Sequence, residues 1–375
     1  MCLEGRGTMD GSELADIKDA IMDQWRSMAG MGAMFVSSIL FGVFIQPFYN
    51  FEEMRAFGEE GTTEAGNILF ELIMIFLFTI AVIWLARKGK EVVIKVIVFL
   101  ALGYSLLLAV MPVLAILDYL LGLDSGPALF SLICLGVAGG MMYTLHRYPE
   151  WYVVNTVGVL VGSGVIVMLG IAFVPVLIIL FMVLAAIYDH WAVNGSKHML
   201  ELADTMIDLK LPVLLVAPKD TSYTFLKQDG DIREGTEPRP QAPPEGSEMR
   251  VAKPKSRDAL FMGLGDVIFP GMLVISSITF LPEIGPVVFD FWGDPSKPVH
   301  LGPMLVGMGT LFGGLLGYAA LMTQVARGKP QAGLPLLNGG SILGYLVSGA
   351  IAIGVENLWQ DITCLLYTSP SPRDS

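Results

Sequence analysis

The chain has 375 residues, of which 54% are hydrophobic and only 15% are charged, whereas soluble domains carry roughly 25% charged residues. Half of the charges gather in the first 30 residues and between Val193 and Asp258, so the long apolar remainder excludes a soluble globular fold. The net charge of −12 argues against a nucleic-acid partner. Three widely spaced cysteines form neither a disulfide framework nor a thiolate metal site. These features predict a polytopic membrane protein.

Nine apolar runs of about 20 residues follow one another along the chain, and runs of this length cross a bilayer as helices. They cover Met28–Phe48, Asn67–Ala86, Val92–Ala115, Pro127–Leu145, Tyr152–Leu169, Ala172–Trp191, Ala259–Leu281, Leu301–Val325 and Gly333–Val355. The predicted fold is therefore an all-α membrane protein with six transmembrane helices in residues 28–191 and three in residues 259–355.

Three segments lie outside these spans. Residues 1–27 place apolar side chains at helical spacing among acidic ones, which predicts an amphipathic helix at the membrane surface. Residues 192–258 form a long loop between the sixth and seventh spans. The last segment, residues 356–375, is a C-terminal tail whose final ten residues are polar and receive no structural role.

The long loop divides into three parts. Residues 196–211 have the pattern of an amphipathic helix, and Val213–Ala217 that of a short strand. From Gln228 to Arg257 the chain is rich in Pro, Gly, Glu and Lys and poor in apolar residues, which predicts disorder.

The basic residues of the short connections predict the orientation in the membrane. The second, fourth and eighth connections carry Lys or Arg, whereas the third and fifth carry none and the first and seventh carry one each. Basic residues are enriched in cytoplasmic loops. We therefore expect a multi-pass protein of the cell membrane whose N-terminus and loop between the sixth and seventh spans are cytoplasmic.

Two aspartates stand out, because an ionisable group inside a span is costly and marks a candidate functional site. Asp189 lies near the end of the sixth span, and Asp266 lies seven residues into the seventh, about 10 Å along a helix. Asp266 is thus expected to lie too deep for a helix cap. Since consecutive helices alternate in direction, both aspartates are expected near the same, cytoplasmic, face.

Two adjacent carboxylates can perform acid–base chemistry. They cannot both ionise easily, so one holds a proton while the other is an anion. The anion can activate a water and the acid can hydrogen-bond a peptide carbonyl, as in aspartic proteases. Two glycines precede the second aspartate in Gly263-Leu264-Gly265-Asp266; they either let a substrate backbone approach or pack helices together. The ninth span opens with Gly333-Leu334-Pro335-Leu336-Leu337 on the same predicted face.

Together these motifs resemble the presenilin and signal peptide peptidase family of intramembrane aspartyl proteases, most closely its archaeal members. That family has Tyr-Asp in the sixth helix, Gly-x-Gly-Asp in the seventh and Pro-Ala-Leu at the start of the ninth. This chain has Tyr188-Asp189, the Gly263–Asp266 motif and Pro335-Leu336-Leu337. One departure is Leu336, where the family usually has alanine, and it concerns the shape of a substrate subsite.

The resemblance implies a function and a set of site residues. Asp189 and Asp266 would be the catalytic pair that hydrolyses peptide bonds within transmembrane segments by activating a water. The residues expected to position the substrate are Tyr188, Gly263, Leu264, Gly265, Leu334, Pro335, Leu336 and Leu337. No cofactor or metal is implied. The expected partners are the transmembrane segments of substrates and the lipid bilayer, with no obligate partner subunit.

Two alternatives stay open at this point. A prepilin-type peptidase also places Gly-x-Gly-Asp in a membrane helix, but it carries a lysine two residues after the aspartate, where this chain has Ile268. A cation- or proton-coupled transporter could use the two aspartates as ion ligands. Such transporters often contain internal repeats, and the sequence shows no repeat.

Overall fold

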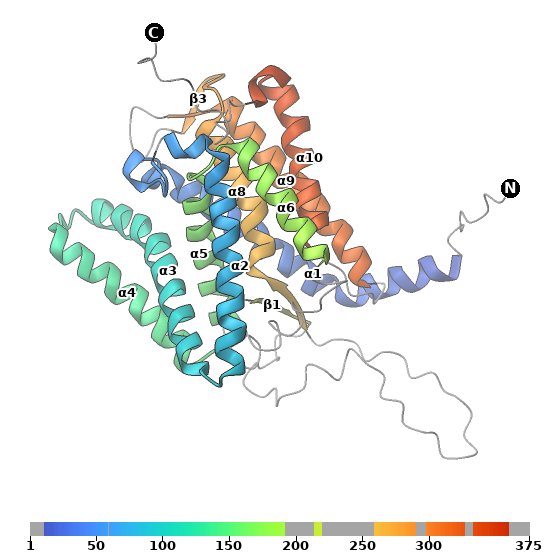
Figure 1. The fold of residues 1–375 in the computed structure, drawn as a ribbon, viewed down its shortest axis with the longest axis horizontal. Helices are drawn as coiled ribbons and strands as arrows, with labels where there is room; N and C mark the ends of the chain where they lie inside the picture. The colour runs from blue at the N-terminus through green and yellow to red at the C-terminus, as the bar shows by residue number, and fades with distance from the viewer. Residues whose placement is uncertain are drawn as a thin grey trace, which may run out of the picture.

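A computed structural model describes residues 11–58, 60–191, 214–219, 259–289, 298–326 and 333–359. Nine α-helices in these residues form a bundle (Figure 1). They are α1 Gly11–Ile45, α2 Ala65–Arg87, α3 Glu91–Leu121, α4 Pro127–Arg147, α5 Trp151–Gly170, α6 Pro175–Trp191, α8 Leu264–Phe280, α9 Leu301–Ala326 and α10 Leu334–Ala352. Every predicted span has its helix, so the predicted fold class is confirmed. Seven of these helices are long enough to cross a membrane, while α6 and α8 have only 17 residues each.

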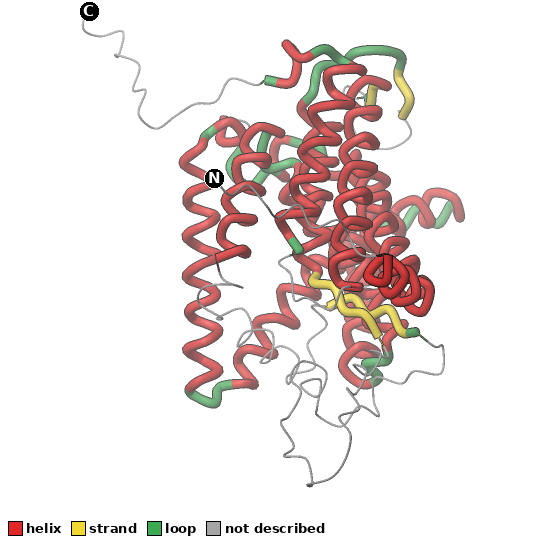
Figure 2. Tube along the Cα trace, turned by 90° about the vertical axis from the view of Figure 1, so that its right-hand side faces the viewer, coloured by secondary structure: helices red, strands yellow, loops and turns green. Residues whose placement is uncertain are grey.

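Two small antiparallel sheets lie at opposite ends of the bundle (Figure 2). At one end β1 (Leu214–Pro218) pairs with β2 (Ala259–Gly263). At the other end β3 (Val287–Phe289) pairs with β4 (Val299–His300). The strand predicted at Val213–Ala217 is therefore present, displaced by one residue.

The seventh span differs from its prediction. Its first five residues, Ala259–Gly263, form β2, and the helix begins only at Leu264. Asp266 is consequently the third residue of α8 and lies in its first turn. The predicted depth of seven helical residues, too deep for a cap, is wrong, because β1 recruits the start of the span into a sheet.

The two ends of the chain and the long loop add smaller differences. The first helix begins at Gly11 and runs without interruption to Ile45, so the predicted tail helix continues directly into the first span. The amphipathic helix predicted at residues 196–211 and the disorder predicted at Gln228–Arg257 lie outside the described residues.

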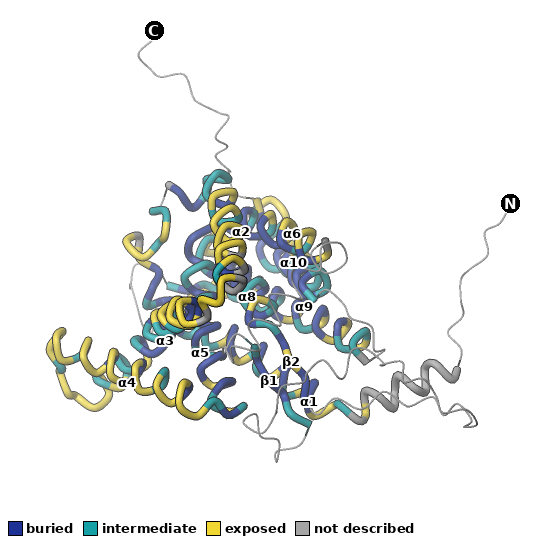
Figure 3. Tube along the Cα trace, turned by 60° about the horizontal axis from the view of Figure 1, so that its bottom comes forward, coloured by how far each residue is buried: buried dark blue, intermediate teal, exposed yellow. Residues whose placement is uncertain are grey.

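Helices α5 and α8 are largely buried at the centre of the bundle, whereas α4 and most of α2 are exposed (Figure 3). On α4 only Cys134, Ala138 and Leu145 are buried. The exposed side chains of both helices are predominantly apolar. In a bilayer such surfaces contact lipid, because lipid chains are as apolar as the side chains themselves. The peripheral helices therefore surround a packed centre that holds the start of α8.

Helices α9 and α10 contact each other through their backbones. Gly309, Gly313 and Gly317 recur every fourth residue on α9, and α10 presents Gly340 and Gly344 to them. A Cβ at Gly313 would overlap the carbonyl oxygen of Gly340, and one at Gly340 would overlap the carbonyl oxygen of Gly313. Small residues permit such close approach between membrane helices, so these two helices form one rigid pair.

We predict that Gly313→Ala destabilises the protein by about 1–3 kcal/mol, because the added methyl overpacks the α9–α10 contact. Gly136→Ala is the matched control. Gly136 lies on the exposed helix α4, and a Cβ there would meet no described atom within 4 Å. Both changes improve helix propensity equally, so the difference between their unfolding temperatures in detergent measures the clash. Equal temperatures would contradict the proposed contact.

Candidate active site

The two aspartates lie on the two short helices. Asp189 is in the last turn of α6 and Asp266 in the first turn of α8. Since α6 ends and α8 begins at the same end of the bundle (Figure 1), the helices bring the two residues to one level. The carboxyl groups are close enough to interact electrostatically. Asp189 is buried, and Asp266 is partly exposed.

The start of α10 lies between the two carboxyl groups. The backbone amide of Leu334 donates a hydrogen bond to Asp189. Beside it, a Cβ at Gly333 would lie 3.4 Å from each carboxylate oxygen of Asp266. One dipeptide therefore contacts both aspartates through its backbone. The first helical turn suits this role, because its N–H groups have no partner within the helix.

The glycines before Asp266 do not pack helices together. The amide of Gly263 donates a hydrogen bond to the Asp266 carboxylate. Gly265 is exposed, and a Cβ added to it would meet no described atom within 4 Å. Of the two explanations that the sequence left open, open space beside Gly265 favours backbone access over helix packing.

Pro270 loosens the helix that carries Asp266. It lies inside α8, four residues after Asp266. A proline has no N–H, so it cannot donate the usual hydrogen bond to the carbonyl of residue i−4. The carbonyl of Asp266 thus lacks its helical partner, and the first turn of α8 is less constrained than a regular helix.

The remaining predicted site residues differ in how exposed they are and in what they contact. Pro335 lines a pocket of about 360 Å³ between α6 and α10, next to Ile187 and His190. Leu334 is buried, and Leu336 packs against the core. Leu337 has no exposed surface and belongs to the core itself. Tyr188 is 40% exposed on the neighbouring face of α6, since consecutive helical residues point about 100° apart. The part of these residues in substrate positioning stays a prediction.

Two asparagines near this end of the bundle were not among the residues predicted from the sequence. Asn338 of α10 lines the same pocket and donates a hydrogen bond to the carbonyl of Met182 on α6, at 3.0 Å. Asn155 of α5 bonds to the backbone of β1. Their only signal in the sequence is a buried amide within an apolar span, which is costly unless it finds partners.

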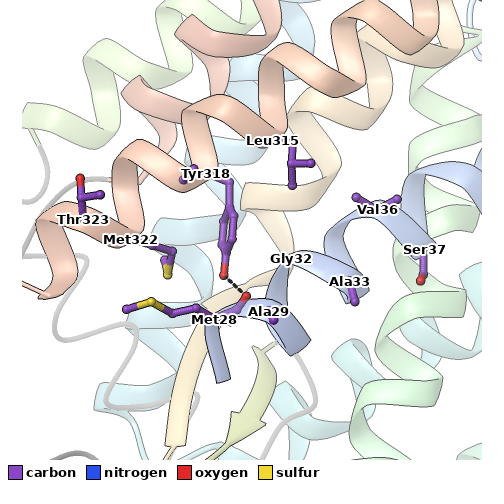
Figure 4. A pocket seen from close by; sticks show the side chains of 11 residues that line it. Met28, Ala29, Gly32, Ala33, Val36, Ser37, Leu315, Tyr318, Met322 and Thr323 are labelled. Carbon is purple, nitrogen blue, oxygen red and sulfur yellow. Dashed lines mark hydrogen bonds between the residues drawn. The ribbon is translucent and has the colours of Figure 1, made fainter. Parts of the chain in front are cut away.

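A larger pocket, of about 710 Å³, lies between α1 and α9, and no predicted site residue lines it. Its walls are almost entirely apolar (Figure 4). At one side the hydroxyl of Tyr318 donates a hydrogen bond to the carbonyl of Met28, at 2.7 Å. The larger of these two pockets therefore does not coincide with the predicted site residues.

Comparisons with known proteins agree with the fold and the motifs. A solved structure described as a presenilin family intramembrane aspartate protease, in space group C222, is 26% identical; it matches 87% of this chain and 99% of its own with a TM-score of 0.56. A second such structure, in space group P2, is 26% identical over 88% of this chain and 100% of its own, with a TM-score of 0.53. No curated protein sequence matches the chain.

The family model described as signal-peptide peptidase, presenilin aspartyl protease matches residues 31–355. This range contains residues 31–45 of α1, the other eight α-helices of the described residues and both aspartates. The chain therefore belongs to the signal-peptide peptidase and presenilin family of aspartyl proteases and is a multi-pass membrane endopeptidase.

Proposed function

We propose that the protein hydrolyses peptide bonds within transmembrane segments and that Asp189 and Asp266 are its catalytic pair. The observation that carries this proposal is the meeting of the two carboxyl groups around the backbone of Gly333 and Leu334. Membership of the family favours proteolysis over the prepilin-type and transporter alternatives.

The chemistry follows from two carboxyl groups that share one proton. The anionic group takes a proton from water, and the water oxygen attacks the peptide carbon while the protonated group donates to the carbonyl oxygen. When the C–N bond of the tetrahedral intermediate breaks, the group that took the proton of the water gives it to the nitrogen, which leaves as an amine. The other group, now anionic, takes back the proton of the hydroxyl formed from the carbonyl oxygen, so the pair is regenerated. This scheme uses no metal or cofactor. It also explains why the site needs a partly exposed carboxylate that water can reach.

We predict that Asp189→Asn and Asp266→Asn each lower the cleavage rate of the purified enzyme by at least about 10²-fold. The double variant should lose little more, since the pair acts as a unit. The parent should have a bell-shaped pH–rate profile, reporting two macroscopic pKa values for the pair.

Asp118→Asn is the control for these variants. Asp118 lies near the end of α3 and accepts a hydrogen bond from the amide of Ser125, which an asparagine can also accept. Cleavage by either single variant at a substantial fraction of the parent rate would refute the assignment of the pair.

The sheet indicates where an opened substrate would bind. Val216 of β1 directs its N–H and C=O away from β2, because both bond to Asn155. In an antiparallel pair the residue opposite must do the same, and Val216 is opposite Phe261. The N–H and C=O of Phe261 therefore point to the far edge of β2, where they have no hydrogen bond to a described residue. We infer that the substrate adds as a strand to this edge of β2.

Binding of the substrate at this edge of β2 can be tested by removing one of its N–H groups. Phe261→Pro removes one N–H from the far edge of β2 without removing a bond to β1. We expect kcat/KM to fall roughly 2- to 10-fold, the value of one net hydrogen bond. Phe261→Ala removes the same ring but keeps the N–H, so a comparison of the two variants isolates the hydrogen bond. Equal kcat/KM values would place the substrate elsewhere.

The way in which a substrate reaches this edge is also part of the proposal. A substrate helix would move laterally from lipid, and the pocket between α6 and α10, beside Asp189, is a suitable passage. With the N-terminus in the cytoplasm, cleavage falls in the cytoplasmic half of the substrate. Before hydrolysis the helix must unwind, and each freed amide needs a new partner in the membrane.

A substrate series tests this unwinding. Glycine near the cleavage position should speed cleavage, and leucine or alanine should slow it, because glycine weakens a helix by roughly 1 kcal/mol relative to alanine. Rates are measured with substrates varied only at these positions, and the product termini are mapped by mass spectrometry. Cuts in the outer half of the substrate, or rates indifferent to helix propensity, would refute the mechanism.

A further inference from the structure

Asn155 of α5 makes two hydrogen bonds to the same residue of β1. Its side-chain amide donates to the carbonyl of Val216 at 2.7 Å and accepts from the N–H of Val216 at 2.8 Å. The side chain is buried, with 8% of the residue exposed. One amide thus satisfies both backbone groups of Val216, as a neighbouring strand would. The contact closes the outer edge of β1 at its centre.

The rest of that edge offers little to another strand. Only alternate residues of β1 direct their backbone groups outward, and these are Leu214, Val216 and Pro218. Pro218 has no N–H to donate, and Val216 is occupied by Asn155. The edge of β2 is therefore the more receptive of the two, because Asn155 occupies the centre of the other.

The face of α5 that carries Asn155 also contacts the start of α8. Asn155, Gly158 and Gly162 share this face, at positions i, i+3 and i+7. A Cβ at Gly158 would lie 2.8 Å from Leu215 of β1, and one at Gly162 would lie 3.3 Å from Leu264. Leu264 is the first residue of α8, two before Asp266. One helix face therefore holds both the sheet and the beginning of the aspartate-bearing helix.

We propose that Asn155 is a positioning residue that fixes where the scissile bond of the substrate meets the aspartates. This inference rests on the proposed function. A strand bound to β2 advances about 3.3 Å per residue, so a small shift of the β1–β2 sheet relative to Asp266 presents a different peptide bond. Asn155 prevents that shift by fixing β1 to α5 at a single residue.

The test uses two substitutions that weaken the contact to different extents. Asn155→Leu has nearly the same volume and removes both hydrogen bonds. Asn155→Asp preserves the shape and can still accept from the N–H of Val216, but its ionised carboxylate cannot donate to the carbonyl. We expect both variants to produce additional cleavage positions, one or two residues away from the parent's. We also expect kcat to fall about 10- to 100-fold with a smaller change in KM, since a misplacement of 1 Å can cost about 10²-fold.

Thr156→Val is the matched control. Thr156 is exposed on the same helix, and its hydroxyl bonds only within α5, to the carbonyl of Tyr152 at 2.8 Å. This variant should keep the parent's kcat and product termini. In the unliganded enzyme, hydrogen exchange of a peptide spanning residues 214–218 should be faster in Asn155→Leu than in the parent and unchanged in Thr156→Val.

The outcomes separate this inference from the proposed function. Parent enzyme that does not cleave, or Asp266→Asn enzyme that does, refutes the proposed function. Parent cleavage together with one unchanged set of product termini in both Asn155 variants, at whatever rate, overturns the positioning role.

Discussion

A backbone amide without a hydrogen-bond partner costs several kcal/mol in hydrocarbon. The arrangement of the candidate site depends on how the backbone groups just before α8 find their partners. Instead of entering as a helix, residues 259–263 enter as a strand, whose N–H and C=O groups need partners outside their own segment. On one side β1 supplies them, and Asn155 in turn satisfies the centre of β1. Strand β2 ends at Gly263, three residues before Asp266. Under the proposed function, its far edge faces the place where an opened substrate would lie.

The lengths of the helices place the carboxyl groups at the correct level. The 17 residues of α6 and of α8 extend about 25 Å each, less than the roughly 30 Å of a hydrocarbon core. Helices α1 and α9, which pack against α8, are longer, with 35 and 26 residues. The two carboxyl groups therefore lie at the ends of helices that are shorter than the core is thick. This geometry reconciles an ionisable pair with a membrane environment.

Much of this arrangement could be predicted from the sequence, and the exceptions share a physical cause. Apolar length alone located the nine helices, and alternation of direction placed Asp189 and Asp266 at one end. The pattern could not show that Ala259–Gly263 is a strand, because a short apolar run has the same composition in a strand and in a buried helix. Its partner, β1, lies some forty residues earlier. The role of Asn155 escaped for the same reason, since a contact across 61 residues has no local signature.

The rigid contact between α9 and α10 has a consequence for how the family can vary. Gly333 and Leu334 approach the aspartates with their backbone, and glycine contacts along α10 hold that backbone in place. The carbonyl of Leu336 is likewise held against Gly317. Side chains in this segment can therefore change while the main chain keeps its path, which is how Leu336 can depart from the alanine of the motif that this segment resembles. Single side-chain replacements at the start of α10 should therefore change activity little, whereas a change that shifts the backbone of this segment should change it much more.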